Sequence, residues 1–119
     1  MSDDTITDLQ AQLRTFATER DWGQFHTPKN LAMALAGEVG ELLEIFQWLT
    51  PEQASEVMRG DRANDVEDEL ADVFIYLARL ADVLDVDLAA AAEGKLDRNE
   101  KRFPPGDVQG RADVPPTRP

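Results

Sequence analysis

Helical spacing of apolar residues, with few glycines and prolines to interrupt it, is the feature of this sequence that most restricts its fold. Of the seven prolines, only Pro28 and Pro51 precede Phe103, and both follow a threonine. A Thr-Pro pair is typical of a helix start, with threonine as the N-cap and proline in the first turn. No apolar run alternates with a period of two residues, as a half-buried strand would require. The sequence therefore predicts an all-α fold.

Four main helical segments are expected, over residues 5–21, 28–49, 63–84 and 88–102. A short helix over residues 51–58, opened by a capping box from Thr50 to Gln53, joins the second to the third. Asp87 is the expected cap of the last segment. With 119 residues, one helical domain over residues 1–104 is expected. Residues 105–119 read as a disordered tail that is rich in proline and poor in apolar residues.

The composition excludes several classes of protein. The net charge of −12 leaves no basic surface for binding the phosphates of nucleic acid. No stretch approaches the roughly 18 apolar residues of a membrane-spanning helix. The acidic start of the chain, with Asp3 and Asp4, does not resemble a secretion signal, and cysteine is absent. A cytoplasmic protein that binds neither nucleic acid nor membrane is therefore expected.

Two pairs of carboxylates stand beside apolar residues that a helix would bury. Glu38 and Glu41 form the first pair, and Glu69 and Asp72 form the second. Residues three apart share one helix face, and an acid close to an apolar stripe is costly without a partner. Two such helices facing each other would give a four-carboxylate site for Mg²⁺, which prefers oxygen ligands. The alternative is that these acids are ordinary exposed residues of amphipathic helices.

Basic and aromatic residues extend this hypothesis to a nucleotide. Lys95, Asn99 and Arg102 fall on one helix face and are suited to phosphate oxygens, although such residues also favour the end of a helix through its dipole. Flat rings near a metal and phosphate site would sandwich a nucleobase, whereas core packing is the alternative. The candidates are Trp22, Trp48 and Tyr76, with the single histidine, His26, which is equally suited to a structural hydrogen bond.

Several catalytic chemistries lack their residues. The chain has no glycine-rich phosphate loop, no thiol and no G-x-S-x-G elbow. Metal-assisted attack of water on a phosphoryl group remains. The rival interpretation is a non-catalytic helical module that binds a partner protein.

At this point the residues resemble a known family, the MazG-like all-α nucleotide pyrophosphohydrolases, and within it the dCTP pyrophosphatase branch. The similarity covers about residues 5–104 and combines an E-x-x-E with an E-x-x-D motif. The segments that carry it are ERDWGQFH (19–26), GEVGEL (37–42), FQW (46–48), ELADV (69–73), IYL (75–77) and KRFP (101–104), with Lys95 and Asn99.

The resemblance implies a four-helix bundle that cleaves nucleoside triphosphates to the monophosphate and pyrophosphate with Mg²⁺. Carried over by position, the metal ligands and catalytic carboxylates would be Glu38, Glu41, Glu69 and Asp72. The substrate would be bound by Trp22, His26, Trp48, Tyr76, Lys95, Asn99 and Arg102. The family assembles as dimers or dimers of dimers, so a homodimer or homotetramer is expected. The implied role is to clear dCTP or modified pyrimidine nucleotides, or other non-standard or oxidised nucleotides, from the pool.

Two positions depart from the wider family pattern. Many members carry an acid directly before the first ligand. This chain has Gly37 there instead, and the dCTP branch also lacks the acid. Close relatives of that branch can carry a histidine in the first helix, in the region where this chain has Leu13. Because of Leu13, the substrate preference of this chain could differ from that of the dCTP branch.

Overall fold

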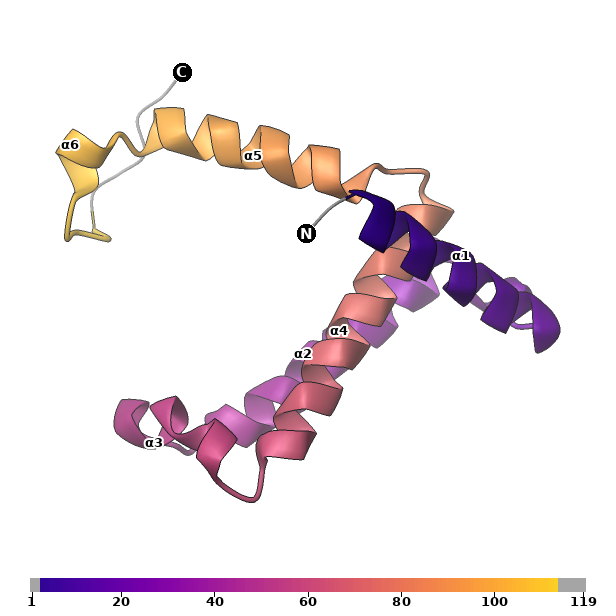
Figure 1. Ribbon diagram of the computed structural model, residues 1–119, viewed down its shortest axis with the longest axis horizontal. Helices are drawn as coiled ribbons and strands as arrows, with labels where there is room; N and C mark the ends of the chain where they lie inside the picture. The colour runs from indigo at the N-terminus through magenta and orange to yellow at the C-terminus, as the bar shows by residue number, and fades with distance from the viewer. Residues whose placement is uncertain (1–2, 114–119) are drawn as a thin grey trace. The chain divides into compact units, whose positions relative to one another are not determined.

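The computed structural model of the chain describes residues 3–113, and this range contains helices and no strand (Figure 1). The predicted all-α fold is confirmed. In chain order the elements are α1 (Asp3–Glu19), η1 (Gly23–Phe25), α2 (Pro28–Phe46), α3 (Pro51–Ser55), η2 (Val57–Arg59), α4 (Ala63–Val83), α5 (Leu88–Arg102) and α6 (Pro105–Val108), where η marks a 3₁₀ turn.

The chain divides into two compact units, Met1–Val86 and Asp87–Pro119, and each is described by itself. The first holds α1, α2 and α4, and the second holds α5 and α6. The single domain over residues 1–104 therefore stays a prediction. Among the described helices, none has both the length and the apolar character needed to cross a membrane.

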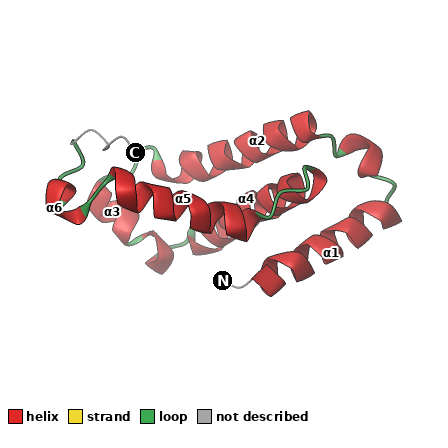
Figure 2. Cartoon of the chain, turned by 90° about the horizontal axis from the view of Figure 1, so that it is seen from above, coloured by secondary structure: helices red, strands yellow, loops and turns green. Residues whose placement is uncertain are grey.

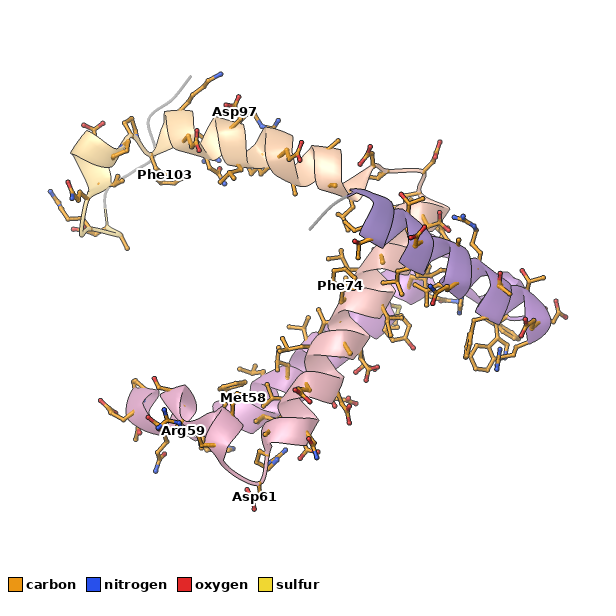
Figure 3. All side chains as sticks on the ribbon, in the orientation of Figure 1. Met58, Arg59, Asp61, Phe74, Asp97 and Phe103 are labelled. Atoms are coloured by element: carbon orange, nitrogen blue, oxygen red, sulfur yellow. The ribbon has the colours of Figure 1, made fainter. Side chains whose placement is uncertain are left out.

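The first unit is built on α2 and α4, which lie side by side and run in opposite directions (Figures 1 and 2). Its core is small and apolar, and Leu31 of α2 is the largest fully buried side chain. The other buried residues are Ile6, Ala17, Ile45, Val66, Ala78 and Ala81. Phe74 lies midway along α4, and Met58, Arg59 and Asp61 lie near its N-terminal end (Figure 3). Carboxylate side chains of α2 and α4 come together between these two helices.

Helix α1 packs near the C-terminal half of α4. Ala78 is fully buried, and its small side chain lets α1 approach closely enough for Gln10 Nε2 to donate to the Ala78 carbonyl oxygen at 2.9 Å. Arg14 Nη1 pairs with Asp82 Oδ1 at 2.6 Å, one turn further along both helices. These contacts fix the side of α4 on which the end of α1 and the following loop lie.

The predicted helix starts are confirmed by their caps. The Thr27 hydroxyl accepts from the Asn30 amide at the start of α2, and the Thr50–Gln53 capping box opens α3. Asp87 accepts from the Ala90 amide at the start of α5.

Helix ends differ from the prediction by a few residues. Helix α1 stops at Glu19 because Asp21 adopts a positive φ of 54°, and the Trp22 amide then donates back to the Ala17 carbonyl. Such a left-handed C-terminal turn is a common helix end. Helix α2 stops at Phe46, since the next turn tightens and the Leu49 amide donates to the Phe46 carbonyl.

The segment expected to be a disordered tail, residues 105–119, begins with a separate short helix, α6. Residues 114–119 of that segment lie outside the described residues. The short helix predicted over residues 51–58 consists of α3 followed by the 3₁₀ turn η2.

Candidate functional site

Three carboxylates converge between α2 and α4. Glu38 and Glu41 come from one face of α2, and Glu69 comes from α4. Each offers one oxygen, and the three oxygens lie within 4.8 Å of one another. Glu38 and Glu69 are half-buried, whereas Glu41 is exposed. The spacing of the two motifs thus brings together three of the four predicted ligands.

Two oxygens of this cluster lack a protein partner. Glu38 Oε2 and Glu69 Oε2 are buried and make no hydrogen bond within the described part of the chain. A buried carboxylate oxygen without a donor is unfavourable, because it has lost water and gained nothing in exchange. An all-oxygen donor set of this kind is suited to a hard divalent cation.

The raised pKa values of the cluster also indicate a site that is suited to a cation. Loss of hydration is the largest cause that raises the pKa of Glu69 to about 7, and the neighbouring Glu38 and Glu41 carboxyl groups raise it further. The pKa of Glu38 is also raised, first by desolvation, with Glu41 and Asp72 adding repulsion. Without a cation, the cluster therefore favours holding a proton.

Asp72 links this cluster to a cavity. Its charge acts on Glu38, yet it is not one of the three convergent carboxylates. It also lines a cavity of about 380 Å³ in the first unit. The cavity is bounded by Leu13, Phe16, Trp22, His26, Asp72, Ile75, Tyr76 and Arg79. The site thus has an acidic end and an adjoining apolar and aromatic pocket.

The cavity is built from three pieces of chain. Leu13 and Phe16 come from α1, Trp22 and His26 from the loop around η1, and the remainder from α4. The positive φ of Asp21 turns the chain into this loop. There the Trp22 ring stands edge-on to Phe16 at 5.6 Å and to His26 at 6.5 Å between ring centroids. Leu13 of α1 thus forms part of the wall of this pocket.

Sequence reasoning missed Arg79. Its Nε donates to His26 Nδ1 at 3.0 Å, and its Nη1 pairs with Asp82 Oδ2 at 3.3 Å. Desolvation, and then the charge of Arg79, lower the pKa of His26. The spacing held a signal, because Asp72, Tyr76 and Arg79 follow one another at three- and four-residue intervals on one face of α4.

The other predicted substrate residues are Trp48, in the first unit, and three residues of α5, in the second. Trp48 follows the end of α2, is 85% exposed and is not among the residues that line the cavity. Lys95, Asn99 and Arg102 belong to the second unit, in α5. Their part in substrate binding stays a prediction.

Comparisons with known proteins find a family model and several relatives that match this chain. The model of the MazG-like family matches residues 34–111. The chain is 46% identical over 101 residues to human dCTP pyrophosphatase 1, covering 84% of this chain and 59% of that protein. It is 44% identical over 104 residues to the bovine protein of the same name, covering 87% and 62%. The chain thus spans about 60% of the length of the curated relatives it matches.

A solved structure is also similar. The crystal structure of a pyrophosphatase from Archaeoglobus fulgidus matches with a TM-score of 0.79 at 42% sequence identity. The match covers 84% of this chain and 93% of that one. The likeness therefore extends from the sequence to the fold.

Proposed function

The chain belongs to the MazG-like family, and from this premise we propose that it hydrolyses nucleoside triphosphates to the monophosphate and pyrophosphate with Mg²⁺. The observation that carries the proposal is the carboxylate cluster with two unpartnered buried oxygens beside an aromatic cavity. The names of the human and bovine relatives, dCTP pyrophosphatase 1, support dCTP or a modified pyrimidine deoxynucleotide as the substrate.

The donor set suits Mg²⁺. Glu38, Glu41 and Glu69 would hold the cation, with Asp72 at its cavity side. When bound, Mg²⁺ supplies positive charge that activates water and stabilises the phosphoryl oxygens. This charge matters here because a triphosphate carries about four negative charges and the chain itself carries −12.

The chain's own residues divide the remaining tasks. Glu41 is the exposed carboxylate of the cluster, so it is the candidate for orienting water toward the α-phosphorus. Trp22 and Tyr76 would stack against the base, with His26 beside them. We assign phosphate binding to Lys95, Asn99 and Arg102 of α5, and a further contact with the nucleotide to Trp48.

A nucleotide panel tests this function. Standard and modified dNTPs and NTPs, each with Mg²⁺, are incubated with the protein, and pyrophosphate release is measured. Fast release from dCTP or a 5-substituted analogue is expected, and Glu41→Gln should remove it. Glu67→Gln is the matched control, because Glu67 is an exposed acid of α4 outside the cluster. Release from oxidised or purine nucleotides alone would keep the enzyme class and reject the dCTP assignment. No release from any nucleotide would favour the helical interaction module.

We also propose a homo-oligomer, a dimer or a dimer of dimers. Large apolar side chains on both α2 and α4 remain exposed, including Met33 (63%), Leu43 (58%) and Leu70 (52%). Exposed apolar surface shared by neighbouring helices is typical of a protein interface. A cytoplasmic location is proposed from the absence of cysteine.

A further inference from the structure

Arg79 is held between two partners at the edge of the cavity. Its Nε donates to His26 Nδ1 at 3.0 Å and its Nη1 to Asp82 Oδ2 at 3.3 Å. The Arg79 side chain is only 13% exposed, and the Asp82 side chain is 17% exposed. Because a guanidinium is planar, two such contacts fix the direction of its remaining nitrogen.

The contact with Arg79 decides which nitrogen of His26 carries the proton. A guanidinium can only donate, so His26 Nδ1 must accept. The imidazole is then neutral, with its hydrogen on Nε2. Burial and the charge of Arg79 lower the pKa of His26, which agrees with a neutral ring. His26 therefore offers an Nε2–H donor to this part of the site.

Arg79 has a further donor, Nη2, that these two contacts do not use. Within the described residues, its Nη2 makes no hydrogen bond, and it is not among the buried unpartnered atoms. It is therefore not fully buried, and both Arg79 and His26 line the cavity. The pocket thus combines aromatic walls with donors on His26 and Arg79, and its other polar groups are the Asp72 carboxylate, the Tyr76 hydroxyl and the Trp22 indole N–H.

We propose that Arg79 determines which pyrimidine base the cavity selects, by fixing His26 as an Nε2–H donor and adding its own Nη2 donor. Cytosine presents two neighbouring acceptors, O2 and N3, that match two donors. Uracil and thymine carry a hydrogen on N3. This N3–H would face a donor of the protein, and that donor would be left without an acceptor. A polar site rejects a base that leaves its groups unpaired more strongly than an apolar pocket does. This inference rests on the proposed function.

A purely structural role is the alternative, and the chain offers a matched control for it. Asp82 also pairs with Arg14 of α1 at 2.6 Å, so this one carboxylate links α1 to α4 through Arg14 and holds Arg79 within α4. Arg14 is half-exposed and does not line the cavity. Arg14→Gln removes the other ion pair of Asp82 and leaves the hydrogen bond from Arg79 to His26 in place.

The first readout needs no turnover. His26 is the only histidine, so its ring nitrogens are directly identified by ¹⁵N NMR. In the wild type Nε2 should be protonated and Nδ1 unprotonated. In Arg79→Gln the ring should populate both tautomers, and in Arg14→Gln it should stay as in the wild type. An unprotonated Nε2 in the wild type would overturn the proposal.

The second readout is the ratio of kcat/KM for dCTP to that for dTTP. Arg79→Gln should lower this ratio roughly ten- to one-hundred-fold, the range expected for losing a charged hydrogen bond. Arg14→Gln should leave the ratio unchanged. An unchanged ratio in Arg79→Gln, or an equal fall in both variants, would refute the role of Arg79. Should Arg79→Gln fail to fold by circular dichroism, Arg79→Lys, which keeps the charge and loses the planar fork, replaces it. A wild type that hydrolyses no nucleotide would instead refute the proposed function.

Discussion

Cation binding at the carboxylate cluster should depend on pH in a way that the raised pKa of Glu69 defines. The pKa lies at about 7 in the folded protein, against 4.5 for an ordinary glutamate. Mg²⁺ binds the ionised form, so it must displace the proton that Glu69 holds below pH 7. The perturbation is a change of pH, compared between the wild type and Glu69→Gln.

The magnitude follows from the titration of one carboxyl group. With a pKa of about 7, Glu69 is roughly one-tenth ionised at pH 6 and nine-tenths ionised at pH 8. The affinity for Mg²⁺ should therefore be about tenfold lower at pH 6 than at pH 8. Protonation of Glu38, whose pKa is also raised, steepens the fall at lower pH. At pH 7, binding should release about half a proton from Glu69.

Stability without metal changes in the opposite direction. Between pH 4.5 and 7 the folded chain keeps the Glu69 proton that the unfolded chain has lost, so the folded state binds more protons. The metal-free protein should therefore lose stability as the pH rises through this window. Added Mg²⁺ should restore stability most strongly above pH 7.

Isothermal titration calorimetry of Mg²⁺ at several pH values, in buffers of different ionisation enthalpy, measures both affinity and proton release. Glu69→Gln should weaken binding at pH 8 and abolish the share of proton release that belongs to Glu69. Glu67→Gln should behave like the wild type. An Mg²⁺ affinity that stays constant from pH 6 to pH 8 would refute this reasoning.

Three further predictions follow from individual residues. Asp72→Asn should remove pyrophosphate release while the circular dichroism spectrum keeps its helical form, and unchanged turnover would exclude Asp72 from the site. Leu31→Ala should lower the free energy of unfolding in urea by about 2–5 kcal/mol, because Leu31 is 2% exposed and its removal leaves a cavity; a change below about 1 kcal/mol would contradict its place in the core. Leu70→Glu should split the proposed oligomer, as measured by light scattering, and a wild type that is already a monomer at micromolar concentration would contradict the proposed interface.

The parts of the fold that could be predicted are those set by neighbouring residues. The caps at Thr27, Thr50 and Asp87 each bind an amide three residues ahead, so a short stretch of sequence contains both partners. The convergence of Glu38 with Glu69 was also accessible, since the i, i+3 spacing and the apolar neighbours define the face that each helix presents.

The parts that escaped prediction depend on tertiary structure. The contact between Arg79 and His26 joins residues 53 positions apart, and it exists because α1 and the η1 loop lie against α4. Helix α2 ends at Phe46, so Trp48 lies in the following turn and is exposed. Arg79 shares one face of α4 with Asp72 and Tyr76, but a lone arginine on a helix is most often a solvated charge.

The position of bond cleavage tests the central claim most directly. The protein is incubated with dCTP and Mg²⁺ in water enriched in ¹⁸O, and the products are followed by ³¹P NMR. The account predicts dCMP that carries the ¹⁸O label together with unlabelled pyrophosphate, because water attacks the α-phosphorus. Label in pyrophosphate, release of inorganic phosphate with dCDP, or intact dCTP would contradict it.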